Sequence, residues 1–288
     1  MNLKMKNVKD LLVEVKAILK DAGIEQYYLD AELFMMEVLN FTKVQLFTKD
    51  DYELTSEEKV SLLNMVKQRV SNIPTQYILG RCEFMGMNFY VDKNVLIPRP
   101  DTEILVERVI DWAKKNKSKS FIDMCTGSGC IAISLVKYLN INGFAADISK
   151  NAIKVAKKNS ILNNVDEKIE FIESDLFSSF SNNNNVDIIV SNPPYISSQV
   201  VETLMPEVKD NEPRNALDGG INGLDFYVKI ARDAVKFLNQ GGGIFFEIGY
   251  DQGESVSKIL KMNNFVDIKV EKDLAGLDRI VWGIKSNV

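Results

Sequence analysis

The 288-residue sequence predicts an α/β domain with a mostly parallel, seven-stranded sheet, preceded by a small all-helical bundle. Two observations lead to this prediction. Apolar residues recur at helical spacing over the first 80 residues, and short apolar strands alternate with helical segments from about residue 120 onward. The length suits one large domain or two modest ones. We therefore expect a helical bundle at residues 1–80, a β-hairpin linker at 81–100 and the α/β domain at 101–288.

The first 80 residues are predicted to form helices joined by short loops. A helix at 8–19 carries its apolar residues at helical spacing, and Gly23 follows it as a stop signal. A second helix covers 28–39. Another opens at Thr55 with a Thr-x-x-Glu capping box and closes before Pro74. Helices with such connections favour a compact bundle.

The predicted linker contains two short strands and a proline-rich run, and the segments after it alternate between strands and helices. Residues 83–89 predict two short strands around a glycine turn, and the Ile-Pro-Arg-Pro run at 97–100 interrupts regular structure. Beyond it we predict strands at 120–124, 142–147, 169–174, 186–191, 244–248, 265–272 and 279–284, and helices at 129–139, 150–163, 224–238 and 253–261. Strands that alternate with helices specify a mostly parallel sheet covered on both faces.

The composition excludes several kinds of site. Histidine is absent, which rules out Ser-His-Asp triads, imidazole bases and His-containing metal sites. Cys82, Cys125 and Cys130 form no CxxC pair, so we expect no metal, no disulfide framework and a reducing cytoplasmic location. The start of the chain has no apolar signal-peptide core, and no apolar run approaches the ~18–20 residues of a membrane span.

The charge distribution bears on partners. The net charge is −5; residues 1–80 hold 10 basic and 12 acidic side chains, and residues 81–288 hold 25 and 28. Proteins that bind duplex nucleic acid usually carry a concentrated positive footprint. We therefore expect no stable nucleic-acid binding.

A glycine-containing loop joins the strand at 120–124 to the next helix. Glycines at such a turn let a ligand approach the backbone, and the helix N-terminus offers free N–H groups. Asp147 ends the following strand, where an acidic residue can accept hydrogen bonds from ribose hydroxyls. Alone, the pattern indicates either a nucleotide-like ligand or a tight turn that packs helix on strand. The loop consists of Cys125, Thr126, Gly127, Ser128 and Gly129.

The second informative segment follows the strand at 186–191. Asn192 stands at its carboxyl end, where α/β folds bind ligands, and Pro193 and Pro194 stiffen the loop. An amide oxygen together with a rigid carbonyl can hold both hydrogens of a substrate –NH2 group. Tyr195 can stack on a flat group.

The sequence Asn192-Pro193-Pro194-Tyr195 resembles the signature of S-adenosylmethionine-dependent amino-group methyltransferases. Further segments resemble the release factor glutamine methyltransferase family, also called the HemK or PrmC family. They run in order from about residue 77 to 280 and comprise Tyr77–Gly80, Ile97–Glu103, Thr126–Gly129, Ser174–Phe177, Asn192–Ile196, Glu212-Pro213, Ala216-Leu217, Gly219-Gly220, Glu247–Gly249 and Asp278-Arg279. The resemblance implies a Rossmann-like class I methyltransferase domain.

The resemblance also implies a cofactor, S-adenosylmethionine, and its contacts. The loop at 125–129 would hold the methionine end, Asp147 the ribose, and a stretch containing Asp175 and Leu176 would border the adenine. Asn192 would lie next to both cofactor and substrate. The chain departs from the family pattern twice: Cys125 replaces a glycine, so we expect an ordinary φ there, and Leu176 replaces an aromatic residue seen in some members.

The implied reaction is N5-methylation of the glutamine in the Gly-Gly-Gln motif of bacterial peptide chain release factors, the proteins of translation termination. Asn192, Pro193, Pro194 and Tyr195 would bind the glutamine amide, residues 1–80 would recognise the substrate protein, and the enzyme would be a monomer. Three alternatives remain: glutamine methylation of a ribosomal protein, an N6-adenine or N2-guanine nucleic-acid methyltransferase, and a noncatalytic cofactor-binding scaffold. The roles of Arg99, Asp101, Glu103 and Arg214 stay open between supporting contacts and ordinary surface charges.

Overall fold

The computed structural model describes residues 7–181 and 185–286 and divides the chain into two compact units. The first unit comprises Met1–Gly80 together with Pro206–Asn211, and the second comprises Arg81–Met205 and Glu212–Val288. Residues 81–100, predicted as a linker, lie within the second unit. A short segment from the last third of the sequence thus groups with the amino-terminal helices.

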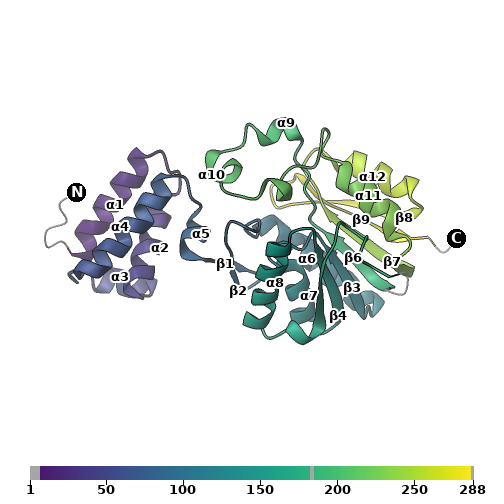
Figure 1. The fold of residues 1–288 in the computed structure, drawn as a ribbon, viewed down its shortest axis with the longest axis horizontal. Coiled ribbons are helices and arrows are strands. Elements are labelled where there is room, and N and C mark those ends of the chain that lie inside the picture. Colours follow the sequence, from purple (N-terminus) through teal and green to yellow (C-terminus); the bar gives the residue numbers. More distant parts are fainter. Residues whose placement is uncertain (1–6, 182–184, 287–288) are drawn as a thin grey trace. The chain divides into compact units, whose positions relative to one another are not determined.

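The first unit is helical (Figure 1). Its amphipathic helices bury one apolar cluster that includes Leu11, Phe34 and Leu62. Two capping boxes fix helix starts: Thr42 with Gln45, and the predicted Thr55 with Glu58. Its helices are α1 (Val8–Asp21), α2 (Tyr27–Leu39), α3 (Lys43–Thr48), α4 (Ser56–Val70), α5 (Thr75–Leu79) and the one-turn α10 (Pro206–Lys209).

A buried arginine explains why Pro206–Asn211 belongs to this unit. Arg69 of α4 is only 6% exposed, and its Nε donates to Oδ2 of the buried Asp30 of α2 at 2.8 Å. A terminal nitrogen of the same guanidinium lies 2.7 Å from a carboxylate oxygen of Glu207 in α10. Because a buried guanidinium is costly unless its charge is paired, these contacts anchor the segment to the helices.

The second unit begins with a β-hairpin, β1 (Arg81–Phe84) and β2 (Met87–Tyr90). Both turn residues, Met85 and Gly86, have positive φ, as a tight two-residue hairpin turn requires. Phe84 and Phe89 are fully buried and pack edge to face, with ring centroids 6.0 Å apart. The hairpin is therefore part of a hydrophobic core.

The remainder of the unit is built on a seven-stranded sheet, which confirms the predicted fold class. Its strand order is β5-β4-β3-β6-β7-β9-β8, and only β9 runs antiparallel to its neighbours. β7 begins six residues earlier than predicted, because Leu238 already pairs with Val186 ahead of a bulge. The strands are β3 (Ser120–Met124), β4 (Asn142–Asp147), β5 (Ile169–Glu173), β6 (Val186–Ser191), β7 (Leu238–Glu247), β8 (Phe265–Lys272) and β9 (Asp278–Lys285).

Helices cover both faces of the sheet. One apolar cluster packs α6 (Pro100–Asn116) and α7 (Cys130–Leu139) on one face, with α8 (Lys150–Leu162) beside α7 (Figure 1). A second cluster packs α11 (Asp225–Ala234) and α12 (Gly253–Met262) on the other. The short elements are η1 (Asp166–Lys168), α9 (Ser198–Val201) and η2 (Arg214–Ala216). Among the described residues, no helix is long and apolar enough to cross a bilayer.

The sheet topology determines where a ligand can bind. From β3 the chain proceeds outward to β4 and β5, then returns to the other side of β3 as β6. The loops after β3 and β6 therefore diverge and leave a crevice at the carboxyl ends of these strands, where open α/β sheets bind ligands.

Candidate active site

A cavity of 390 Å³ lies at this edge of the second unit. Its volume falls within the range of about 300–1,000 Å³ typical of small-molecule sites. The predicted site residues that line it are Cys125, Thr126, Gly127, Ser128, Asp147, Asp175, Leu176, Asn192 and Pro194. Gly129, Pro193 and Tyr195 are not among its lining residues; Gly129 is the N-cap of α7, and Pro193 is buried.

The loop after β3 has an unusual backbone. Gly127 and Gly129 have φ values of 55° and 81°, and a Cβ on Gly127 would meet no atom within 4 Å. Cys125 also has a positive φ, 63°, so the expectation of an ordinary φ was wrong. The turn imposes the left-handed conformation whichever residue occupies it, and a residue with a Cβ bears a strain of roughly 1–2 kcal/mol there.

Asp147 closes the loop from the end of β4. Its Oδ2 accepts the Gly127 N–H at 2.9 Å, and its Oδ1 accepts the Ser149 N–H at 2.8 Å. Burial raises the pKa of this carboxyl, and the two amide hydrogen bonds oppose the rise. A carboxylate has about four lone-pair positions, so two more donors can still be accepted from the cavity.

Asp123 supports the loop from within β3. It is fully buried, and its Oδ2 accepts the Thr126 hydroxyl at 2.6 Å and the Ala132 N–H at 3.2 Å. Burial raises the pKa of Asp123 to about 7. Its hydrogen bonds join the loop to the first turn of α7 and so hold the glycine turn in place.

Cys125 belongs to this loop and Cys130 begins α7, and neither has the character of a reactive thiol. Burial raises the pKa of Cys125 far above its ordinary value and that of Cys130 to about 12. A thiol must be deprotonated to act as a nucleophile, so both cysteines serve as small packing residues. Among the described residues, no cluster of acidic and cysteine side chains is arranged to hold a metal ion.

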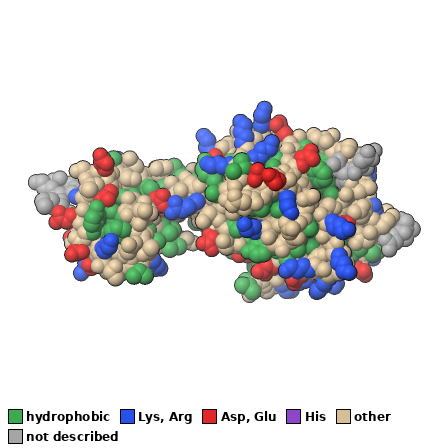
Figure 2. Space-filling model, turned by 90° about the horizontal axis from the view of Figure 1, so that it is seen from below, with side chains coloured by type: hydrophobic (Ala, Val, Ile, Leu, Met, Phe, Trp, Pro, Cys, Tyr) green, Lys and Arg blue, Asp and Glu red, His purple; other side chains and the backbone are tan. Residues whose placement is uncertain are grey.

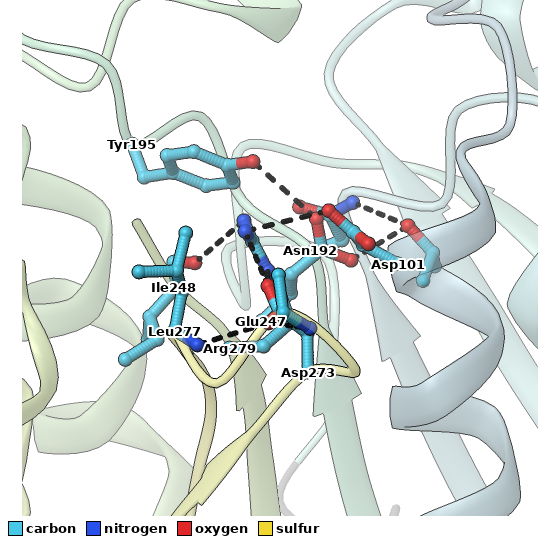
Figure 3. Close-up of polar contacts among 10 residues, drawn as sticks. Asp101, Asn192, Tyr195, Glu247, Ile248, Asp273, Leu277 and Arg279 are labelled. Carbon is cyan, nitrogen blue, oxygen red and sulfur yellow. Dashed lines mark hydrogen bonds and ion pairs between the residues drawn. The ribbon is translucent and has the colours of Figure 1, made fainter. Parts of the chain in front are cut away.

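Asn192 stands directly after β6, and a chain of hydrogen bonds holds its side chain. Its Nδ2 donates to Oγ1 of Thr102 in α6 at 3.2 Å, and that hydroxyl donates to Oε2 of Glu247 at 2.6 Å. The Tyr195 hydroxyl lies 3.4 Å from the other oxygen of Glu247 (Figure 3). Burial raises the pKa of Tyr195, so its hydroxyl keeps its proton.

The segment at 217–223 packs tightly against the Asn-Pro-Pro-Tyr loop. The Gly219 N–H donates to the Ile196 carbonyl at 2.8 Å, and a Cβ on Gly219 would lie 2.7 Å from the Pro194 carbonyl oxygen. The side chain of Gln252 donates to the Tyr195 carbonyl at 3.0 Å. These contacts fix the backbone that carries Asn192.

Comparisons with known proteins identify the family of this chain. The model of the PrmC N-terminal domain matches residues 10–80, and that of the methyltransferase small domain matches residues 100–210. The release factor glutamine methyltransferase of Clostridium botulinum is 43% identical, and the alignment covers 95% of this chain and 98% of that protein. The chain belongs to the release factor glutamine methyltransferase family. The enzyme of that name from Clostridium acetobutylicum is 39% identical over 98% of this chain and 99% of its own.

Solved structures with lower sequence identity to this chain support the methyltransferase fold. The hMettl16 catalytic domain, solved in complex with MAT2A 3′UTR hairpin 6, superposes with a TM-score of 0.55 at 17% identity, covering 80% of this chain and 82% of that chain. A methyltransferase from Pyrococcus furiosus gives a TM-score of 0.52 at 14% identity, with coverage of 81% and 100%. At these identities the likeness concerns the fold alone.

The four residues left open by the sequence all have partners in this family member. Arg99 forms an ion pair with Glu212, and Arg214 contacts Glu202 and Asp218. Glu103 accepts the N–H of the hairpin residue Met85 at 2.5 Å, and Asp101 lies 3.4 Å from Arg279 (Figure 3). None of these contacts by itself assigns a chemical role.

Sequence reasoning missed Thr102 and Glu247. Both lie inside segments that resembled the family, yet neither was assigned a role. They are 145 positions apart and meet only because the start of α6 packs beside the carboxyl end of β7. The available signal was that a glutamate follows directly after the apolar run Ile244-Phe245-Phe246, a position where burial of a carboxylate requires partners.

Proposed function

We propose that this protein transfers a methyl group from S-adenosylmethionine to the side-chain nitrogen, N5, of the glutamine in the Gly-Gly-Gln motif of peptide chain release factors. The observation that carries the proposal is the position of Asn192, which lines the same cavity as the glycine loop and Asp147. The 43% identity to the Clostridium botulinum enzyme supports the choice of substrate.

The residues around the cavity fit the cofactor. Asp147 retains accepting capacity for the ribose hydroxyls, and the space beside Gly127 allows the methionine portion to approach the backbone. Asp175 and Leu176 line the part proposed to border the adenine. When bound, S-adenosylmethionine supplies an electrophilic methyl group on a sulfonium.

Asn192, Pro193 and Tyr195 are proposed to act on the substrate glutamine. Its amide nitrogen is a poor nucleophile because its lone pair is delocalised, so positioning must supply much of the rate. The Asn192 Oδ1 and the Pro193 carbonyl would accept the two amide hydrogens and stabilise positive charge as the nitrogen forms its new bond to carbon. The methylated nitrogen then releases one proton to water.

The helical unit is proposed to recognise the release factor. A second docking surface raises selectivity for one glutamine among many by increasing its effective concentration at the active site. On the face seen in Figure 2, basic side chains form several groups separated by acidic and uncharged ones. The net charge of −5 favours a protein substrate over a nucleic-acid duplex.

Labelled cofactor tests this proposal directly. The protein is incubated with a purified release factor carrying either Gly-Gly-Gln or Gly-Gly-Glu, and the position of the label is read by mass spectrometry. We expect label on the glutamine of the first and none on the second, because a carboxylate has no nitrogen to methylate. In a parallel incubation with cell extract, ribonuclease should not remove the label. Label on RNA, on a ribosomal protein alone, or on the Gly-Gly-Glu protein at the same site would contradict the proposal.

A further inference from the structure

The buried carboxylate of Glu247 receives two hydroxyl groups, and both belong to the environment of the Asn-Pro-Pro-Tyr loop. Oε2 accepts Thr102 at 2.6 Å and Oε1 lies 3.4 Å from the Tyr195 hydroxyl. The Glu247 side chain is 1% exposed, and it does not line the cavity. Figure 3 shows Glu247 between Asn192 and Tyr195, with Arg279 beside it. Any effect of Glu247 on the cavity must therefore pass through these neighbours.

The single proton of the Thr102 hydroxyl determines which atom of the Asn192 side-chain amide can form a hydrogen bond with Thr102. A hydroxyl has one proton to donate and two lone pairs. With its proton on Glu247, Thr102 presents only lone pairs to Asn192, so it can accept the Nδ2–H but cannot donate to Oδ1. Among the described residues, no hydrogen bond to Oδ1 is present, which leaves this oxygen to accept a donor from the cavity that Asn192 lines.

We infer that Thr102 and Glu247 are positioning residues, which fix the side-chain amide of Asn192 so that its oxygen rather than its –NH2 group meets the substrate amide. The inference rests on the proposed function for its catalytic consequence. The opposite orientation would place two –NH2 groups against each other, and the substrate nitrogen would lose its acceptor. The hydrogen bonds from Asn192 to Thr102 and from Thr102 to Glu247, here called the relay, thus favour a substrate that donates hydrogen bonds. A glutamine amide donates hydrogen bonds, whereas a glutamate carboxylate does not.

The charge of Glu247 controls the direction of the relay. The charged and titratable groups that interact with it are Arg279 of β9, Asp101 of α6, Tyr195, Tyr227 of α11 and Cys130 of α7. Burial raises the pKa of Glu247 to about 7, against the hydrogen bond from Thr102 and the charge of Arg279. Below this pH the protonated carboxyl can donate to Thr102, whose own proton is then free to turn toward Asn192. Methyl transfer should accordingly rise with pH through about 7.

Three variants test the relay, with two kinds of measurement. Thr102→Val keeps the shape of the side chain but removes the hydroxyl, whereas Thr102→Ser restores it. We expect Thr102→Val to lower kcat by about 10-fold or more with little change in cofactor affinity, and Thr102→Ser to recover most of the loss. Glu247→Gln cannot ionise, so its activity should no longer rise through pH 7.

The second measurement needs no substrate. In protein labelled with 15N-asparagine, the Asn192 –NH2 signals, identified by their loss in Asn192→Ala, should titrate near pH 7 in the wild type. They should shift in Thr102→Val and lose the titration in Glu247→Gln. Ser134→Ala is the control, because it removes a buried hydroxyl of α7 that donates to the main-chain oxygen of Cys130 at 2.7 Å. It should lower stability while leaving the amide signals and the pH profile as in the wild type.

The outcomes separate this inference from the proposed function. If Thr102→Val matches the wild type in kcat and in the amide signals of Asn192, the relay is wrong even though methyl transfer occurs. If the signals respond as expected but the wild type methylates no release factor, the relay stands as an orienting device and the substrate assignment fails.

Discussion

Replacing Gly219 with alanine should slow methyl transfer without displacing the cofactor. The new Cβ would lie 2.7 Å from the Pro194 carbonyl oxygen and 2.8 Å from the Tyr195 Cα. Ordinary contacts begin at 3.4 Å, so the Asn-Pro-Pro-Tyr backbone must retreat by about 0.7 Å. Since both obstacles are backbone atoms, no side-chain rotation can relieve the contact. Gly219 has no positive φ, so the perturbation is purely steric.

The size of the effect follows from that displacement. A shift of about 1 Å in a reacting group can cost roughly 100-fold in rate, so we expect kcat to fall by about 10- to 100-fold. Overpacking of this kind also lowers stability by about 1–3 kcal/mol. The assay is steady-state methylation of the release factor, with the cofactor dissociation constant measured by calorimetry. Cofactor affinity should change little, because Gly219 does not line the cavity.

Gly241→Ala is the matched control for a glycine replacement. A Cβ there meets no atom within 4 Å, although its φ of 73° strains an alanine by roughly 1–2 kcal/mol. This variant should lose stability and keep kcat. A Gly219→Ala enzyme with kcat within twofold of the wild type would refute the claim that this glycine sets the position of the loop.

Three further predictions concern the cofactor site, the substrate site and the helical unit. Asp147→Ala should weaken cofactor binding in calorimetry by about 1–3 kcal/mol, since it removes the acceptor proposed for the ribose; an unchanged affinity would remove Asp147 from the site. Asn192→Ala should abolish most methyl transfer while retaining much of the cofactor affinity, and turnover at the wild-type rate would contradict the mechanism. Arg69→Met should lower the free energy of unfolding by about 3–5 kcal/mol, measured with urea, because it leaves Asp30 buried and unpaired. Adding Asp30→Leu should recover part of that loss, and equal stability of the single variant and the wild type would refute the anchoring role.

Sequence periodicity predicted the sheet well because its strands are short apolar runs between clear turn signals. β3 and β6 have the predicted bounds, and Asn192 stands where the strand pattern placed it. The predicted elements left out α6, whose first residue is Pro100. Proline interrupts most regular structure, yet it suits the first helical position, where its missing N–H has no partner to lose.

The contacts that complete the site could not be predicted in the same way. A positive φ at Cys125 is imposed by the turn and leaves no mark on the residue type. The Thr102–Glu247 hydrogen bond joins residues 145 positions apart, and no local pattern encodes such a pairing. Local patterns identify the elements and the motif residues, whereas the groups that orient those residues emerge only from tertiary packing.

The grouping of Pro206–Asn211 with the amino-terminal helices has consequences for folding during synthesis and for the exchange of domains between relatives. During synthesis, Arg69 leaves the ribosome long before Glu207 exists, so the helical unit cannot complete its charge pairing until more than two thirds of the chain has been made. For the same reason, a chain that begins near residue 81 divides a compact unit rather than removing one. An exchange of helical units between relatives should therefore carry two pieces of sequence, the first 80 residues and the six around Glu207, if the transplanted arginine is to find its partner.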